Sequence, residues 1–293
     1  MSRNLTELFP DEIAAALARA PILVLPLGTI EWHSHHLPLG LDGLVAADIC
    51  GAIAEACDGV SGPVSYWGIG GVPYPYTLKL SIELVEPVLS GLFEQFGAMG
   101  FRVILAFAGH FGVDQTLALK RAAVDVMDRS PVTVLPLTEY DLVSDMYTGD
   151  HAGPGETSLM WAVSEGLVRI RELDPAIALD GVIGEDPRLH ASKELGVKLK
   201  TAIVERERSG SPEGTRSLGR PAAAIYRSDA RSRPRRGRDP GAASLPAKIL
   251  SATAGDTGIR VALCCDLAGR LCCRKEVRRG EAGRPGQLTV PSS

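Results

Sequence analysis

Five of the six histidines fall in three short segments that also carry carboxylates or glycines; they are His33, His35, His36, His110 and His151. The first segment, 28–42, also holds Glu31 and Asp42. In an extended chain, residues two apart face the same side, so Glu31 and His33 offer an oxygen and a nitrogen in one direction. A turn at 38–40 can bring Asp42 back beside them, where its carboxylate could bridge two metal ions.

The other two segments add side chains of the same kinds. Segment 107–112 ends an apolar run and sets His110 between two glycines, which allow close approach of the backbone. Segment 150–158 is a loop of Gly and Pro that runs into a helix, so His151 and Glu156 are acid–base candidates. Mixed imidazole and carboxylate ligands suit Zn²⁺, Mn²⁺ or Fe²⁺.

A single histidine after a strand is more often a hydrogen-bonded structural residue than a metal ligand. Four of the side chains are better considered together: Glu31, His33, Asp42 and His110. Burying so many ionisable groups near strand ends costs free energy unless a metal ion or mutual pairing compensates. The sequence therefore predicts that these four residues bind metal.

The elements that must position these residues alternate between strand-like and helical patterns, as in an α/β sheet covered on both faces. Helices between strands require parallel crossovers, and ligands of such sheets collect beyond the carboxyl ends of the strands. The expected strands are 22–27, 64–67, 103–108 and 132–137, and the expected helices are 42–57, 83–99, 114–127 and 156–168.

The composition excludes several classes of protein. With 293 residues, 45% of them hydrophobic, and 31 Lys and Arg against 35 Asp and Glu, the chain is too apolar for a disordered protein and too evenly charged for a nucleic-acid binder. Its longest apolar stretches, 21–30 and 103–108, are too short to span a membrane. Acidic residues interrupt the first 20 positions, so we expect no secretory signal and a cytoplasmic protein. The six cysteines show neither a disulfide framework nor a Cys-x-x-Cys pattern.

The chain changes character near Arg208. Residues 1–208 carry 15 Lys and Arg against 28 Asp and Glu, whereas 209–293 carry 16 against 7, with 14 Arg and 2 Lys. We expect one folded domain over 1–208 and an Arg-, Gly- and Pro-rich tail over 209–293 that is irregular or disordered. A basic arm for nucleic acid is the less favoured reading, since no aromatic residue follows Tyr226 to stack on a base. An out-of-frame extension remains a third reading of the tail.

Residues 28–42 fit the pattern G-x-x-E-x-H-x-x-H-L-P-L-x-x-D throughout, and this pattern resembles the opening motif of the creatininase (creatinine amidohydrolase) family. The similarity continues at 109–110, 151–158 and 184–196 and so covers nearly all of 1–208. The resemblance implies a three-layer α/β/α fold with a mainly parallel sheet, a homohexamer, and a hydrolytic site with two divalent ions.

Carried over by motif position, the resemblance makes Glu31, His33, Asp42 and His110 metal ligands, with Asp42 bridging. His151 falls at a catalytic histidine, and Glu156 is either a proton relay or a further metal contact. We expect the substrate, a small molecule, to be bound by His36, Phe111, Tyr147 and Asp150.

Departures from creatininase itself argue against creatinine as the substrate. Gly112 stands where creatininase has a carboxylate ligand, Phe111 and Val113 replace the Gly and Asn of relatives with a G-H-G-G-N loop, and Tyr147 replaces a tryptophan. Segment 74–77 reads Tyr-Pro-Tyr-Thr in place of Phe-Pro-Gly-Thr. We expect water activated between two metal ions to hydrolyse a non-peptide C–N bond in a small cyclic amide, lactam or formamide.

Other readings remain open at this stage. Within the fold they are a formamide deformylase of a cofactor pathway, a peptidase that trims a modified peptide as in the mycofactocin system, and a ring-opening lactone or diketone hydrolase. A non-catalytic metabolite-binding relative is the reading from a different class. The intact set of four predicted ligands argues against the last of these.

Overall fold

The computed structural model describes residues 3–147 and 149–209, and the backbone of 250–253, 259–265 and 271–277. The chain divides into two units, Met1–Asp239 and Pro240–Ser293, which are treated separately. Among the described residues, no helix combines the length and the apolar character needed to cross a lipid bilayer.

The first unit is built on a parallel sheet with the strand order β2-β1-β3-β4. Its strands are β1 (Ile22–Leu27), β2 (Val60–Ser61), β3 (Val103–Ala108) and β4 (Thr133–Thr138). In the central pair, Ile22 lies opposite Val103 and Leu27 opposite Ala108. Both strands are continuous apolar runs because each face of the sheet is covered, which is typical of parallel sheets. Their predicted bounds are confirmed.

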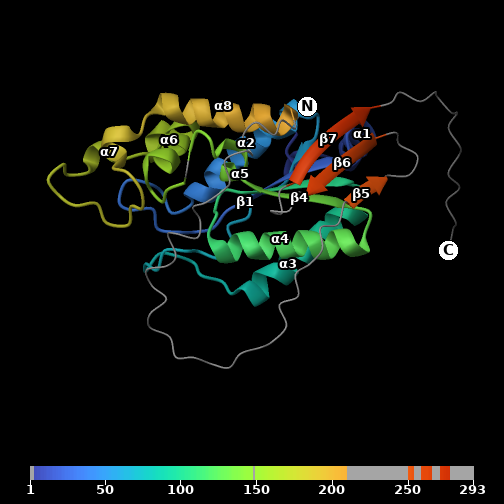
Figure 1. Ribbon diagram of the computed structural model, residues 1–293, viewed down its shortest axis with the longest axis horizontal. Coiled ribbons are helices and arrows are strands. Elements are labelled where there is room, and N and C mark those ends of the chain that lie inside the picture. The colour runs from blue at the N-terminus through green and yellow to red at the C-terminus, as the bar shows by residue number, and fades with distance from the viewer. Residues whose placement is uncertain (1–2, 148, 210–249, 254–258, 266–270, 278–293) are drawn as a thin grey trace, which may run out of the picture. The chain divides into compact units, whose positions relative to one another are not determined.

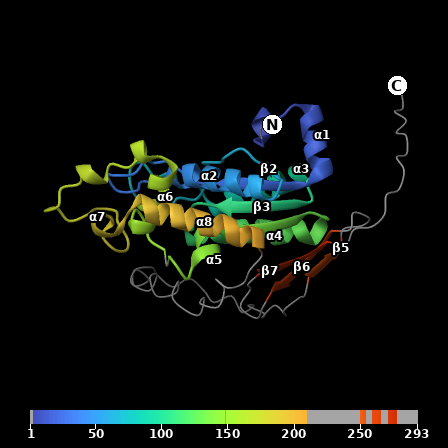
Figure 2. The same cartoon turned by 90° about the horizontal axis from the view of Figure 1, so that it is seen from above.

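Helices cover both faces of this sheet and give three layers, α/β/α (Figures 1 and 2). On one face α3 (Ile82–Ala98) and α4 (Val113–Arg129) share a buried core with side chains such as Leu23 and Ile104, and α1 (Pro10–Arg19) adds Ala16. On the other face α2 (Leu41–Ala56), α6 (Pro154–Val163) and α8 (Lys193–Ser209) enclose a core that includes Val24 and Phe107. The predicted fold class is confirmed.

Shorter elements connect these layers. They are the helices α5 (Glu139–Val143) and α7 (Pro187–His190) and the 3-10 turns Leu5–Glu7, Glu165–Leu167 and Ile170–Glu172. The helix that begins before Glu156 ends at Val163, earlier than expected, because Ser164 has extended dihedral angles (φ −154°, ψ 102°). Helices α1 and α8 had no counterpart among the expected elements.

The strand expected at 64–67 is wrong. Within that segment Ser65 makes a single bridge to Leu27, and the strand of this region is the two-residue β2. The backbone of Ser65 makes two hydrogen bonds, to Pro26 and Gly28, but they form an isolated bridge. Trp67 is 71% exposed, so the segment also lacks the burial of a central strand.

In the second unit, three strands form an antiparallel sheet with the order β5-β6-β7. They are β5 (Leu250–Thr253), β6 (Ile259–Cys265) and β7 (Leu271–Val277). These three stretches are strands, whose β-branched and other apolar residues favour that conformation, and the domain bounds 1–208 and 209–293 and the irregular character of the tail stay predictions. The remainder of the expected tail, 210–249, 254–258, 266–270 and 278–293, lies outside the described residues.

Candidate metal centre

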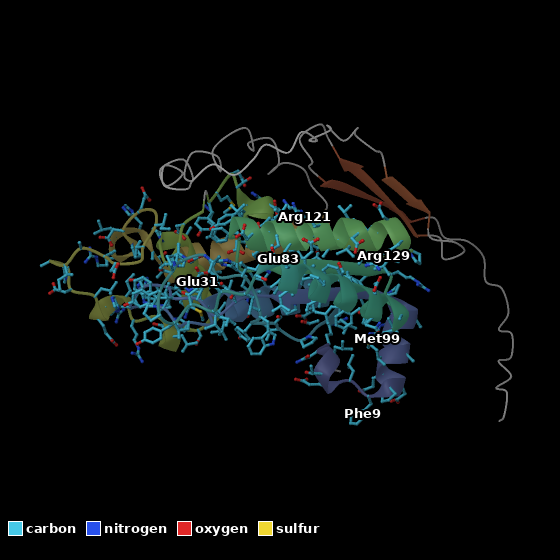
Figure 3. The ribbon with its side chains drawn as sticks, turned by 90° about the horizontal axis from the view of Figure 1, so that it is seen from below. Phe9, Glu31, Glu83, Met99, Arg121 and Arg129 are labelled. Atoms are coloured by element: carbon cyan, nitrogen blue, oxygen red, sulfur yellow. The ribbon has the colours of Figure 1, made fainter. Side chains whose placement is uncertain are left out.

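The predicted site residues meet at the carboxyl edge of the parallel sheet. Glu31 and His33 follow β1, His110 follows β3, Asp42 lies in the first turn of α2, and Glu156 lies in the first turn of α6. Each of the five is less than a tenth exposed. Glu31, labelled in Figure 3, lies toward the end of the domain away from the labelled residues at the far ends of α3 and α4.

The first group of possible ligands, called triad A, consists of Glu31, Asp42 and His110. His110 Nδ1 lies 2.9 Å from Glu31 Oε2 and 3.3 Å from Asp42 Oδ2. One nitrogen or oxygen from each residue lies within 4.8 Å of the others, a spacing that can hold one metal ion.

The second group, triad B, consists of His33, Asp42 and Glu156. His33 Nε2 lies 3.0 Å from Asp42 Oδ1 and 3.7 Å from Glu156 Oε2. Asp42 belongs to both triads. Its Oδ2 faces His110 in triad A and its Oδ1 faces His33 in triad B, which is the arrangement of a bridging carboxylate. A further group of Glu31, His33 and His151 satisfies the same spacing.

Hydrogen bonds from the backbone direct these ligands. Glu31 Oε1 accepts hydrogen bonds from the N–H groups of Gly71 (3.0 Å) and Val72 (2.5 Å), which leaves Oε2 toward His110. His33 Nδ1 donates to the carbonyl oxygen of Glu31 (3.0 Å), so its Nε2 points toward triad B. Such partners fix the tautomer and the orientation of metal ligands.

The residues fit a metal ion by their unsatisfied atoms. Glu31 Oε2, His33 Nε2 and both carboxylate oxygens of Asp42 are buried and have no well-directed hydrogen bond in the described part of the chain. Burying such atoms without partners costs free energy, and a cation would compensate. The donor set of imidazole and carboxylate suits Zn²⁺, Mn²⁺ or Fe²⁺.

The ionisable side chains of the two triads shift one another's pKa values. Burial opposes the charged form of His110, but Asp42 and Glu31 outweigh burial and hold its pKa well above the usual range. Burial likewise opposes ionisation of Asp42, yet His33 and His110 keep its pKa below the usual range. For Glu156, burial and then the charges of Asp150 and Asp42 raise the pKa well above normal, although His33 Nε2 lies 3.7 Å from its Oε2.

Close backbone contacts set the spacing of the strand ends and α2. A Cβ atom on Gly28 would lie 2.3 Å from the backbone nitrogen of Gly43, and one on Gly109 would lie 2.2 Å from the carbonyl oxygen of Asp42. Only glycine permits this approach. The ends of β1 and β3 therefore touch the start of α2 directly, without side chains between them.

Both predicted acid–base residues lie at this centre. The His151 ring stacks on His33 with 4.5 Å between ring centroids, and its Nε2 is 2.8 Å from the carbonyl oxygen of Trp32. Burial, and then the positive charge that His33 can carry, lower the pKa of His151 to about 4. Glu156 Oε2 accepts a hydrogen bond from Ala152 N–H (2.6 Å) and faces triad B.

Three of the four residues predicted to bind substrate are already hydrogen-bonded inside the domain. His36 Nε2 lies 2.9 Å from Thr157 Oγ1. Tyr147 donates to Asp150, whose carboxylate also accepts the N–H groups of Gly155 (2.6 Å) and Glu156 (3.2 Å). Asp150 therefore caps the first turn of α6.

The fourth predicted substrate residue, Phe111, packs edge-on against Tyr140, with 4.1 Å between ring centroids. A pocket of about 650 Å³ is lined by Trp161, Ile170, Arg188 and their neighbours, and none of the four residues lines it. Substrate binding by His36, Phe111, Tyr147 and Asp150 stays a prediction.

Two residues of this region were not foreseen from the sequence. Glu139, the first residue after β4, is 1% exposed, and Tyr140 next to it donates a hydrogen bond to the Tyr147 hydroxyl (3.0 Å). The signal that could have indicated Glu139 is a carboxylate two residues after the predicted strand 132–137, at the same edge as the histidines.

We expect the free energy of unfolding to fall as the pH drops from 7 to 5, in part because of His36. Burial, then His33 and His35, lower the pKa of this buried side chain from 6.5 to about 4. Between these values the unfolded chain binds more protons than the folded one, so stability present above pH 6.5 is lost as the pH falls toward 4. The part due to His36 is about 2 kcal/mol at pH 5.

Urea unfolding of the wild type and of His36→Gln at pH 7 and 5 measures this contribution. The variant should lose less stability between the two pH values than the wild type. His190→Gln, at an exposed position, serves as the control and should follow the wild type. Equal losses in all three proteins would contradict the prediction.

Comparisons with known proteins agree on one family. The family model described as Creatininase, creatinine amidohydrolase, matches residues 6–224. Creatinine amidohydrolase from Pseudomonas putida is 26% identical over an alignment of 173 residues, and the match covers 50% of this chain and 66% of that enzyme, just under two thirds of its length. Mycofactocin precursor peptide peptidase from Mycolicibacterium smegmatis is 26% identical over 178 residues, 56% of this chain and 69% of that protein.

Solved structures show the same fold. A crystal structure of creatinine amidohydrolase (creatininase) superposes with a TM-score of 0.63 at 20% identity and covers 72% of this chain and 97% of that one. A putative creatinine amidohydrolase from Bacteroides fragilis NCTC 9343 gives a TM-score of 0.56 at 21% identity, with 71% and 95% covered. Two other creatininase structures are named for manganese and for a Zn-Zn type. The family model matches well over half of the length of this chain, and the chain therefore belongs to the creatininase family of amidohydrolases.

Proposed function

We propose that this chain is a metal-dependent amidohydrolase that binds two divalent cations, Zn²⁺, Mn²⁺ or Fe²⁺. Its reaction is the hydrolysis of a non-peptide C–N bond in a small cyclic amide, lactam or formamide. The observation that carries the proposal is the position of Asp42, which the two triads share: one of its oxygens faces His33 and the other faces His110. The proposal includes a cytoplasmic location and a homo-oligomer, which is a hexamer by resemblance to the family.

Each triad has a defined place in this proposal. Glu31 and His110 hold one cation with Asp42, and His33 and Glu156 hold the other. Two cations so placed lower the pKa of water and polarise a carbonyl group. The contribution of Glu156 is then that of a ligand, because its oxygen faces His33 and Asp42.

His151 is the residue that moves a proton in this proposal. With its pKa near 4 the ring is neutral at pH 7. If Nε2 donates to the carbonyl oxygen of Trp32, then Nδ1 carries a free lone pair and accepts a proton. The same atom can return that proton to the departing nitrogen, as general acid–base catalysis requires.

The choice of substrate rests on the differences from creatininase. Gly112 has no side chain with which to contact a ligand, and the hydroxyl of Tyr147 is hydrogen-bonded to Asp150. A small cyclic amide, lactam or formamide other than creatinine is the first candidate. A peptide is the second, and the observation that favours it is the similarity to the M. smegmatis peptidase.

Metal analysis tests the proposal. We expect two equivalents of Zn, Mn or Fe per chain in the purified or reconstituted protein, and loss of both from the double variant His33→Ala, His110→Ala, which removes one ligand from each triad. The matched control is His190→Ala, on the surface and outside both triads. A wild type that binds no metal after reconstitution would refute the proposal.

The metal-loaded protein should then be assayed with lactams, formamides, creatinine and short peptides, with release of an amine or ring opening as the readout. Turnover of a lactam or formamide by the wild type but not by the double variant supports the first candidate. Turnover of peptides alone would replace it with the second.

A further inference from the structure

Glu139 is a buried acidic residue that none of the roles above accounts for. Its side chain is 1% exposed, and Oε2 has no hydrogen-bond partner within the described residues. The carboxyl group interacts with the backbone N–H of Glu139 itself. An unpartnered oxygen of this kind lowers the stability of the folded protein unless something else binds it.

The sheet places Glu139 beside the metal centre. Strands β3 and β4 are parallel neighbours, and Ala108 lies opposite Thr138 at their carboxyl ends. The next residues along the two strands are Gly109 and Glu139, so Glu139 leaves the sheet next to the segment that carries His110. The charges that act on Glu139 include Asp42 and His110, two of the three members of triad A.

The neighbours of Glu139 leave it without a positive partner of its own. Asp42 and Asp150 repel its charge, Glu156 is affected by it in turn, and His110 is already placed between Glu31 and Asp42. Burial and these acidic neighbours raise the pKa of Glu139 to about 8. A cation at triad A is the group that would offset this concentration of buried carboxylates.

Triad A leaves room for further ligands, of which a water molecule is one. It offers three donor atoms, whereas zinc takes at least four ligands and manganese often six. The loop after β3 cannot supply another side chain from Gly112, because a Cβ atom there would lie 2.5 Å from His110 Nε2. The next strand in the sheet is β4, and the first side chain after it is Glu139.

We infer that Glu139 is an additional oxygen ligand of the cation bound by Glu31, Asp42 and His110. Its carboxylate does not belong to the groups whose donor atoms lie within 4.8 Å of one another, so it reaches the cation by rotation of its side chain when the ion binds. The inference rests on the proposed function, since it requires a cation at triad A.

The test is metal affinity in Glu139→Gln, which keeps the size of the side chain and an oxygen that can accept the backbone hydrogen bond. Titration of the metal-free full chain with Zn²⁺ against a chromophoric chelator should show one of the two sites weakened about 10–100-fold. Titration with Co²⁺ should show a changed visible absorption spectrum, because loss of a ligand alters the coordination of the ion. Glu139→Asp, which shortens the side chain, should weaken the same site.

The matched control is Thr29→Val. Thr29 Oγ1 is also buried and has no hydrogen-bond partner among the residues that the structure describes, but it is neutral and lies outside both triads. This variant should keep the Zn²⁺ affinities and the Co²⁺ spectrum of the wild type.

The outcomes separate the inference from the proposed function. Wild-type affinity and spectrum in Glu139→Gln would overturn the inference and leave the proposed function intact. Weaker binding with an unchanged Co²⁺ spectrum would also overturn it, since Glu139 would then act from outside the coordination sphere. A wild-type chain that binds neither ion would overturn both.

Discussion

Replacement of Asp42 by Asn should remove both cations from the protein and lower amidohydrolase activity at least about 1,000-fold, a loss of about 4 kcal/mol of transition-state stabilisation. The reason is that Asp42 offers one oxygen to each triad, 3.0 Å from His33 Nε2 and 3.3 Å from His110 Nδ1. An amide cannot bridge two cations as a carboxylate does, and it carries no charge to attract them. Elemental analysis and activity assays of the purified variant measure the two effects.

Two variants serve as controls for this result. Glu31→Gln removes a carboxylate from triad A alone, and Glu156→Gln removes one from triad B alone. Each should lose one cation and keep the other. If Asp42→Asn loses a single equivalent as they do, Asp42 does not bridge two ions and the binuclear proposal fails.

Gly196→Ala should lower the free energy of unfolding by about 3 kcal/mol, the upper part of the usual range for overpacking a core. Gly196 lies in α8 where this helix packs on α6, and a Cβ atom there would lie 1.8 Å from the carbonyl oxygen of Ser158. The helices would have to move apart, and the midpoint of thermal unfolding should drop by about 10 °C. Because α6 carries Glu156, affinity for the cation at triad B should fall as well.

Gly91→Ala is the matched control in a helix. Gly91 lies in α3, and a Cβ atom there would meet nothing within 4 Å. This substitution should raise stability by about 0.5–1 kcal/mol, because alanine has the higher helix propensity. Thermal unfolding of both variants measures the difference, and equal stability of the two would show that α6 and α8 do not pack as closely as described.

Much of the centre could be predicted because its signals are local in the sequence. The apolar runs of β1 and β3 stop just before Glu31, His33 and His110, and parallel strands bring their carboxyl ends to one edge. The turn after His36 brings the chain back, so that Asp42 lies at this same edge of the sheet. In the structure the four predicted ligands, Glu31, His33, Asp42 and His110, lie together, while metal binding by them stays a prediction.

The rest depends on packing between distant segments. The direction of Glu156 follows from how α6 docks, and the carboxylate of Asp150 is occupied because α6 begins beside it. Glu139 went unnoticed because one acidic residue after a strand is a weak signal until the neighbouring strand is known. Helix α8 carries many charged residues, and such a pattern by itself is typical of a solvent-exposed segment.

The contacts among Gly28, Gly43, Gly109 and Asp42 bear on how this protein can change over evolutionary time. Backbone atoms have the same size in every sequence, so a contact between two backbones does not widen or narrow when core side chains are replaced. Substitutions on the helices and in the interior can therefore accumulate while Glu31, Asp42 and His110 keep their mutual distances. A lineage with this construction can exchange the residues that surround a substrate and retain the chemistry, which accords with a shared fold at about 20% identity.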